Sequence, residues 1–192
     1  MYIVFEGIDG AGKTTQIELL KNKLSNAIFT KEPGGTPFGI KAREILLHQD
    51  LKSKKAELFL FLADRAEHFK EVIEPNIDKL IISDRSLISG IAYALASNKK
   101  FDINFLIELN RFALNNTLPQ KAVIFKINRT TLIERLSKKV HDSIEKRGYD
   151  YLLTIQDYIF EVAKKLNINY LEIDASMDEI TIHKEILAYL KI

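Results

Sequence analysis

Three glycines and a lysine separate an apolar run from a helical segment close to the start of the chain. Gly7 is followed by four residues and then by Gly12, Lys13 and Thr14, which fits the pattern G-x-x-x-x-G-K-[ST]. In this pattern the glycines let backbone N–H groups converge on phosphates, the lysine supplies a positive point charge, and the threonine hydroxyl suits Mg²⁺. The sequence therefore predicts a phosphate-binding loop. Its residues are Gly7, Ile8, Asp9, Gly10, Ala11, Gly12, Lys13, Thr14 and Thr15.

A second group of charged residues, Asp84 and Arg85, follows the β-rich run Leu80–Ser83. In an open parallel sheet the carboxyl ends of the strands lie along one edge, so this pair is expected beside the phosphate-binding loop. The aspartate could orient Mg²⁺ together with Thr14, and the arginine could hold a second phosphate through two parallel hydrogen bonds. The stiff loop "KEPGGTPFG", which carries Lys31, is expected at the same edge. A structural ion pair is the alternative interpretation of Asp84 and Arg85.

Two phosphate sites side by side indicate a donor and an acceptor of a phosphoryl group. If the acceptor is itself a phosphate, its oxygens are ionised near neutral pH and the transfer needs no strong general base. Phe61 and Arg65 are four residues apart on an expected helix, so their side chains share one face. They could stack on a base and bind its edge, whereas core packing is the alternative for Phe61.

Short β-rich runs alternate with helical segments along the whole chain, which predicts an α/β fold. We expect a three-layer α/β/α arrangement of the P-loop NTPase type around a five-stranded parallel sheet. The expected strands are 2–6, 27–30, 80–83, 122–127 and 169–173. The expected helices are 14–24, 38–48, 54–73, 87–96, 103–114, 130–139, 150–166 and 177–190. The spacing of Ser176 and Glu179 predicts a capping box at the start of the last helix.

The 192 residues are expected to form one domain, 1–192, because no linker or composition shift divides them. The 28 basic and 26 acidic residues leave a net charge of +2 and form no basic stripe, so we expect no nucleic-acid partner. The chain has no cysteine and no apolar run long enough for a bilayer, which favours a cytoplasmic protein without a membrane partner. The charged stretch Ser137–Gly148 is expected to be a mobile surface segment.

Five segments in consistent order resemble the thymidylate kinase family over nearly the whole chain. They are "FEGIDGAGKTTQ", "EPGGTPFG", "FLADR", "DRSLISGIAY" and "RTTLIERLSKKVHDSIE". The resemblance implies Mg²⁺-dependent transfer of the γ-phosphate of ATP to dTMP, which gives dTDP and ADP for dTTP synthesis. It also implies a homodimer and a lid near residues 135–148.

The resemblance also assigns roles to single residues. Asp9 would bind the 3′-hydroxyl of dTMP, and Arg85 and Lys31 would bind its phosphate. Phe61 would stack on thymine and Arg65 would reach thymine O4. The full dTMP set is Asp9, Lys31, Phe61, Arg65, Arg85, Ser89 and Tyr93, of which Tyr93 would crowd the sugar 2′ position. The catalytic set is Lys13, Asp9, Asp84, Arg85, Arg135 and Lys139, and the metal set is Thr14 and Asp84.

Two departures from the family pattern concern the catalytic cation. Gly10 stands where one branch of the family carries an arginine, and Ser143 follows Asp142 where the other branch carries one in the lid. The cation is therefore expected among other basic residues of the lid. A different nucleotide or nucleoside kinase is the main alternative function. A GTPase switch fits poorly because Asp102 falls one residue too late for Asn-Lys-x-Asp, and a purely structural protein would not need charges at three strand ends.

Overall fold

The centre of the molecule is a sheet of five parallel strands in the order β2-β3-β1-β4-β5. The structure is a computed structural model that describes residues 1–49, 51–137 and 148–192. The strands are β1 (Tyr2–Glu6), β2 (Ile28–Lys31), β3 (Ile81–Asp84), β4 (Lys121–Lys126) and β5 (Asn169–Asp174). The parallel sheet confirms the fold class and all five expected strands, with boundaries shifted by one residue at most ends.

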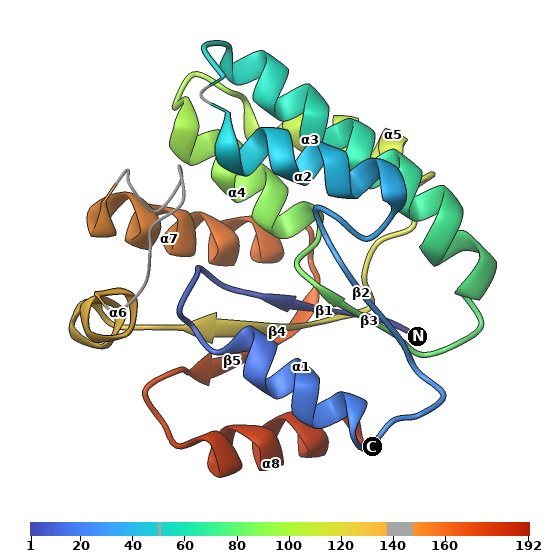
Figure 1. Ribbon diagram of the computed structural model, residues 1–192, viewed down its shortest axis with the longest axis vertical. Helices are drawn as coiled ribbons and strands as arrows, with labels where there is room; N and C mark the ends of the chain where they lie inside the picture. Colours follow the sequence, from blue (N-terminus) through green and yellow to red (C-terminus); the bar gives the residue numbers. More distant parts are fainter. Residues whose placement is uncertain (50, 138–147) are drawn as a thin grey trace.

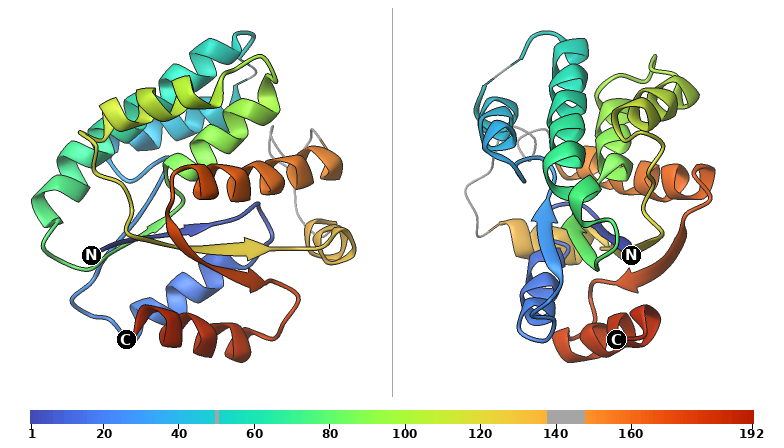
Figure 2. Two further views of the ribbon diagram at one scale, coloured as in Figure 1. Left: turned by 180° about the vertical axis from the view of Figure 1, so that it is seen from behind. Right: turned by 90° about the vertical axis from the view of Figure 1, so that its right-hand side faces the viewer.

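Eight α-helices in the described part of the chain cover both faces of this sheet (Figures 1 and 2). Helices α1 and α8 lie on one face. Helices α4 and α7 lie on the other, and α2, α3 and α5 continue that layer past the sheet. The bounds are α1 (Lys13–Lys21), α2 (Pro37–His48), α3 (Lys54–His68), α4 (Leu87–Ser97), α5 (Ile103–Ala113), α6 (Arg129–Leu136), α7 (Tyr149–Lys165) and α8 (Glu179–Leu190).

The central strands are buried on both faces, which explains their continuous apolar runs. Ile3, Val4 and Phe5 of β1 have no exposed surface, and neither has any residue of 122–125 in β4. Strand β2 lies at one edge of the sheet, and its residues are partly or largely exposed. The register brings the strand ends level, because Asp84 of β3 pairs with both Phe5 and Lys31. The three loops that follow β1, β2 and β3 therefore start side by side.

Two expectations about helix ends are wrong. The helix predicted to run to Ile73 ends as an α-helix at His68 and continues as a π-helical turn, Phe69–Ile73, and a 3-10 turn. Pro75 lies in the 3-10 turn, where its ring and missing N–H prevent regular α-helical bonding. The capping box at Ser176 does not form either, because the carboxylate of Asp178 accepts the N–H groups of the next turn instead.

None of the helices in the described ranges combines the length and the apolar character of a membrane span. The helix expected at 130–139 is described only as α6, which ends at Leu136. The remainder of the expected lid, 138–147, lies outside the described residues.

Candidate active site

The phosphate-binding loop joins β1 to α1 at the carboxyl edge of the sheet, in the structural context that its sequence pattern requires. Gly12 directly precedes α1 and has a φ of 96°, a left-handed conformation that glycine adopts without a Cβ penalty. At Gly7 a Cβ atom would lie 2.9 Å from the carbonyl oxygen of Phe125. The loop thus packs against the end of β4, where a side chain at position 7 would clash. At position 12 the backbone conformation favours glycine.

Lys13 is folded back onto the loop. Its Nζ donates hydrogen bonds to the carbonyl oxygens of Gly7 at 2.9 Å and Ile8 at 3.0 Å. Burial, and then the positive charge of Arg85, lower the pKa of Lys13 to about 8. An ammonium held only by two carbonyls in a buried site is poised to exchange them for phosphate oxygens, which are stronger acceptors. The neighbouring Thr14 is exposed in the first turn of α1.

Arg85 links the loop to the end of β3. It donates through Nη2 to Asp9 Oδ1 at 2.7 Å, and through Nη1 to the Gly7 carbonyl at 2.7 Å and to Ser89 Oγ at 3.2 Å. Burial would raise the pKa of Asp9, but the charges of Arg85 and Lys13 outweigh it and lower this pKa to about 2. Asp9 is therefore ionised at neutral pH. The Arg85 guanidinium joins the end of β3 to the loop that follows β1.

One carboxylate oxygen of Asp84 is buried without a hydrogen bond. This oxygen, Oδ1, has no partner among the residues that the structure describes. Buried carboxylate oxygens are normally bonded, so an orphaned one beside a phosphate-binding loop fits a missing cation or its water. Asp84 lies at the end of β3 beside this loop, and Thr14 is exposed at the start of α1.

A cavity opens next to the loop and encloses about 530 Å³ of empty space, part of it open to solvent. Its lining combines aromatic rings with guanidinium groups and carboxylates, a mixture that suits a charged ligand with a flat ring. Six of the seven residues predicted to bind dTMP line it, namely Asp9, Phe61, Arg65, Arg85, Ser89 and Tyr93. Lys31 is not among the lining residues, and its side chain is exposed at the end of β2.

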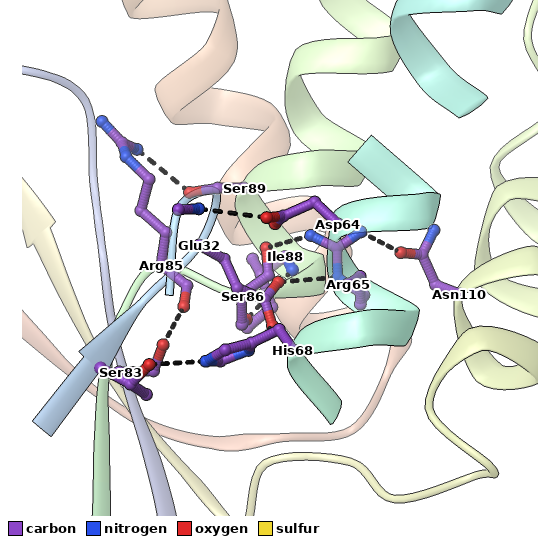
Figure 3. A network of polar contacts seen from close by, with 12 residues as sticks. Glu32, Asp64, Arg65, His68, Ser83, Arg85, Ser86, Ile88, Ser89 and Asn110 are labelled. Atoms are coloured by element: carbon purple, nitrogen blue, oxygen red, sulfur yellow. Dashed lines mark hydrogen bonds and ion pairs between the residues drawn. The ribbon is translucent and has the colours of Figure 1, made fainter. Parts of the chain in front are cut away.

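Helix α3 contributes Phe61 and Arg65 to the wall of the cavity. The Arg65 side chain is 3% exposed and its Nε donates to Glu32 Oε2 at 2.9 Å (Figure 3). Glu32 also contacts His68 Nδ1 through Oε1 at 2.8 Å. The cavity wall therefore combines an aromatic ring and a fixed guanidinium from α3 with Asp9 of the phosphate-binding loop and with Arg85.

Comparison with known proteins bears directly on this arrangement. The family model described as thymidylate kinase matches residues 5–186. The chain belongs to the thymidylate kinase family. Among the relatives of this kinase, thymidylate kinases from a Sulfurovum species and from Nautilia profundicola are 54% and 55% identical, each with 100% of both chains covered. The crystal structure of thymidylate kinase from Ehrlichia chaffeensis is similar with a TM-score of 0.79 at 29% identity, and covers 100% of this chain and 98% of that one.

Family membership confirms the sequence-based identification and the predicted reaction class. The protein is an ATP-dependent kinase that phosphorylates dTMP. The alternative of a GTPase switch is thereby set aside. The roles of single residues rest on the geometry alone.

Sequence reasoning missed Arg43. Arg43 lies on α2, lines the cavity, and donates through Nη1 to the carbonyl oxygen of Pro33 at 3.0 Å. Its charge also helps to lower the pKa of Asp9, to a smaller extent than the charges of Arg85 and Lys13. The position of Arg43 in the helix that follows the "EPGGTPFG" segment could have indicated a phosphate ligand. The sequence pattern favoured Lys31 instead, because Lys31 directly precedes the same segment.

Arg135 bridges the loop to the segment after β5. Its Nη1 donates to the Gly10 carbonyl at 3.0 Å and its Nη2 to the Ala175 carbonyl at 2.6 Å. Its described position is thus beside the phosphate-binding loop, and a catalytic role for Arg135 stays a prediction. Lys139, the other lid residue predicted to be catalytic, lies outside the described residues.

Glu6 is a second residue that the sequence did not single out. It is fully buried at the end of β1 and accepts hydrogen bonds from the hydroxyls of Ser86, at 2.6 Å, and Ser89. Burial raises the pKa of Glu6 to about 7, although the two hydroxyls oppose the shift. Glu6 thus holds Ser89, which itself accepts from Arg85, in place behind the cavity.

Replacing Glu6 with glutamine is expected to change how stability depends on pH. Because the folded protein raises the pKa of Glu6 from 4.5 to about 7, this carboxyl stabilises the fold below pH 4.5 and that contribution is lost as the pH rises through 7. The unfolding free energy of Glu6→Gln minus that of the wild type should therefore increase by about 2–3 kcal/mol as the pH rises from 5 to 8. Urea unfolding at several pH values measures this difference, and a difference that stays constant with pH would contradict it.

Proposed function

We propose that ATP binds the phosphate-binding loop while dTMP occupies the adjoining cavity, with Arg85 between the two sites. One observation supports this above all. The cavity brings together side chains from the loop, from the "EPGGTPFG" segment and from α2, α3 and α4 directly beside the loop. Each end offers groups that suit one part of a nucleoside monophosphate, with charges near the loop and an aromatic ring far from it.

The donor side consists of the loop residues 7–15. The backbone N–H groups of the loop and the start of α1 would face the β- and γ-phosphates, and Lys13 would move from its carbonyl partners onto them. We assign Thr14 and Asp84 as the residues that hold Mg²⁺, because Thr14 is exposed and Asp84 Oδ1 has no hydrogen-bond partner among the described residues. When bound, Mg²⁺ neutralises charge on the β- and γ-phosphate oxygens.

The acceptor side binds the phosphate and sugar of dTMP. Arg85 and Arg43 are the guanidinium groups that line the cavity on this side, and both can bind phosphate in two parallel hydrogen bonds. Lys31 is retained as a weaker candidate for this phosphate, because it is exposed outside the cavity. The Asp9 carboxylate can accept a hydrogen bond from the 3′-hydroxyl, and the Tyr93 ring, which packs 5.5 Å from the Arg85 guanidinium, limits space at the 2′ position.

The transfer depends more on the alignment of the two substrates than on general acid–base catalysis. An oxygen of the dTMP phosphate forms a bond to the γ-phosphorus of ATP, and the bond from that phosphorus to the β–γ bridging oxygen breaks, so ADP leaves with the electron pair. The attacking oxygen is already ionised near neutral pH, so no residue has to remove a proton. Lys13 and Arg85 stabilise the charge on the oxygens of the moving phosphoryl group.

The ring of Phe61 is proposed to stack on thymine, and this assignment competes with a role in the core. Phe61→Leu should raise KM for dTMP about tenfold while KM for ATP stays unchanged, because a flat aromatic contact of ~1–1.5 kcal/mol is lost. Phe69→Leu is the matched control, since Phe69 is 5% exposed in the core. It should lower the unfolding temperature and leave KM for dTMP unchanged. Equal KM values for dTMP in Phe61→Leu and the wild type would show that Phe61 packs in the core and does not bind the base.

The catalytic cation of the transfer is proposed to come from the segment 135–148, as the sequence predicted. Arg135 is the candidate with a described position, beside Gly10. Four separate variants test the proposal through kcat at saturating dTMP: Arg135→Gln, Lys138→Gln, Lys139→Gln and Arg147→Gln. Unchanged kcat in all four would place the cation elsewhere.

A homodimer is proposed from three exposed phenylalanines, Phe59 on α3 and Phe105 and Phe112 on α5. Phe112 is 84% exposed, and it shares a helix face with Phe105 seven residues earlier. Because α3 and α5 pack against each other, these rings lie on adjoining helices of one layer. Exposed aromatic side chains of this size are typical of protein–protein interfaces.

Replacing exposed phenylalanines of this surface with glutamate is expected to dissociate the dimer. Phe105→Glu combined with Phe112→Glu should change the sedimentation behaviour of the protein from dimer to monomer at micromolar concentration. Ile180→Glu is the control, because Ile180 is 67% exposed on α8 across the sheet. A wild-type protein that sediments as a monomer would refute the dimer.

We further propose that the chain acts as one nucleotide kinase domain in the cytoplasm. Both substrates are charged nucleotides that a cytoplasmic enzyme can reach without transport. Cell fractionation with an activity assay tests this location, and activity in the membrane or secreted fraction would contradict it.

A further inference from the structure

The guanidinium of Arg65 is held by acceptors from three separate elements. Its Nε donates to Glu32 at 2.9 Å, its Nη1 to Asn110 Oδ1 at 2.6 Å, and its Nη2 to the Ser86 carbonyl at 3.1 Å (Figure 3). A guanidinium has five N–H groups, so these bonds leave one N–H on each terminal nitrogen without a partner among the described residues. Arg65 also lines the cavity. Its remaining donors are therefore available to a ligand there.

Asn110 is the acceptor whose own orientation is fixed. It lies on α5, is 1% exposed, and donates through Nδ2 to the carbonyl oxygen of Leu106 at 2.7 Å. Turning the amide over would place its NH₂ group against the guanidinium and its oxygen against a carbonyl, so the network determines which atom faces Arg65. Asn110 does not line the cavity. Any effect it has on a ligand must pass through Arg65.

Helix α4 closes the other side of the guanidinium. A Cβ atom at Gly90 would lie 2.7 Å from Nη2 and 3.0 Å from Nη1 of Arg65. The terminal nitrogens therefore pack directly on the helix backbone at Gly90, and little room is left for other orientations. The Glu32 carboxylate already balances the charge of Arg65. A neutral amide at position 110 adds an acceptor to this buried pair without adding a second uncompensated charge.

We propose that Asn110 is a positioning residue for base selection, which holds the Arg65 guanidinium so that its free N–H groups face the pyrimidine. Thymine presents a carbonyl oxygen at position 4, which accepts these donors, whereas cytosine presents an amino donor, which they repel. Without the Asn110 oxygen, Arg65 loses its shortest hydrogen bond. Its guanidinium is then held by Glu32 and the Ser86 carbonyl alone among the described acceptors, so the free N–H groups are oriented less accurately toward the base. This proposal rests on the proposed function, because it requires that the base lies at the Arg65 end of the cavity.

The test compares the dissociation constants for dTMP and dCMP, by calorimetry, in five proteins: wild type, Asn110→Leu, Arg65→Ala, the double variant and Gln156→Leu. Asn110→Leu keeps the shape of the side chain and removes the acceptor. It should weaken dTMP binding about tenfold, lower the preference for dTMP over dCMP by a similar factor, and leave kcat at saturating dTMP unchanged. In the Arg65→Ala background the same change should have no further effect on the preference.

Gln156→Leu is the matched control, because Gln156 is another buried amide, 6% exposed, whose side chain bonds Ile127 far from Arg65. It should lower the unfolding temperature and leave the preference unchanged. The proposal is overturned if folded Asn110→Leu keeps the wild-type preference, if Gln156→Leu loses it equally, or if Asn110→Leu loses it equally without Arg65. Should Asn110→Leu not fold, Asn110→Ser, whose hydroxyl is too short to reach Nη1, is judged by the same outcomes.

The same data separate this proposal from the proposed function. A wild-type protein that does not bind dTMP would refute the proposed function. An unchanged preference in Arg65→Ala would refute base reading by Arg65, and Asn110 with it. A preference that changes in Arg65→Ala but not in Asn110→Leu would refute only the role of Asn110.

Discussion

Replacing Lys13 with alanine is expected to lower kcat by at least about 10²-fold. In the structure Lys13 Nζ is buried and donates to the carbonyl oxygens of Gly7 and Ile8, a position from which it can reach phosphates bound in the loop. A charged group at a transferring phosphoryl contributes roughly 3–4 kcal/mol in a desolvated site, and each 1.36 kcal/mol changes the rate tenfold. Steady-state kinetics with saturating dTMP and ATP measures the loss.

The control for this prediction lies on the same helix. Lys21 in the last turn of α1 pairs with Glu18 on the surface, where both side chains are about half exposed. Lys21→Ala should therefore leave kcat unchanged. A folded Lys13→Ala protein with near-normal turnover would show that the loop lysine does not act on the phosphoryl group.

Replacing Arg85 is expected to lower kcat/KM for dTMP by about 10²-fold or more with little change in KM for ATP. Arg85 bonds Asp9, Ser89 and the loop carbonyl of Gly7, and each charge-assisted hydrogen bond that it would donate to the acceptor phosphate contributes roughly 1.5–3 kcal/mol. The loss should fall on the acceptor, because Arg85 lines the cavity. Titration of dTMP at fixed ATP, and of ATP at fixed dTMP, separates the two substrates.

The backbone at Arg85 offers an internal control. Its φ of 72° is left-handed, which costs roughly 1 kcal/mol for any residue with a Cβ atom and nothing for glycine. Arg85→Gly should thus unfold at a higher denaturant concentration than Arg85→Ala, while both lose activity alike. If Arg85→Gly kept wild-type affinity for dTMP, Arg85 would be structural, which was the alternative interpretation of the Asp-Arg pair.

Features set by local spacing were predictable from the sequence. The phosphate-binding loop needs glycines and a lysine at fixed positions, and parallel strands place the residues that follow them at one edge. This is why Asp9 and Arg85 were expected to be neighbours, and they are joined by an ion pair of 2.7 Å.

Side-chain direction and long-range partners were not predictable. Successive side chains alternate along a strand, so Lys31 at the end of β2 is exposed while the next residue, Glu32, is buried in the cavity wall. The partners of Arg65 are 21, 33 and 45 residues away in the sequence. No local pattern marks such contacts, and Asn110 in particular lies within an apolar helix whose periodicity only indicates burial.

Helix ends were predicted least well, because several signals compete at each end. Ser176 has the spacing of a capping residue, yet its hydroxyl and N–H donate to Asp174. The carboxylate of Asp178, one residue before α8, accepts the N–H groups of both Ile180 and Thr181. A carboxylate at a helix N-terminus also interacts favourably with the helix dipole, which favours Asp178 over a neutral hydroxyl.

The central claim is that this cavity selects dTMP as the acceptor for a phosphoryl group from ATP. The most direct measurement is ADP release from Mg-ATP in the presence of dTMP, dCMP, dGMP and AMP, each tested over a range of concentrations. The account predicts that dTMP gives the highest kcat/KM, and that dCMP is rejected because its amino group faces the donors of Arg65. A higher kcat/KM with any other of these monophosphates, or no ADP release with dTMP, would contradict it.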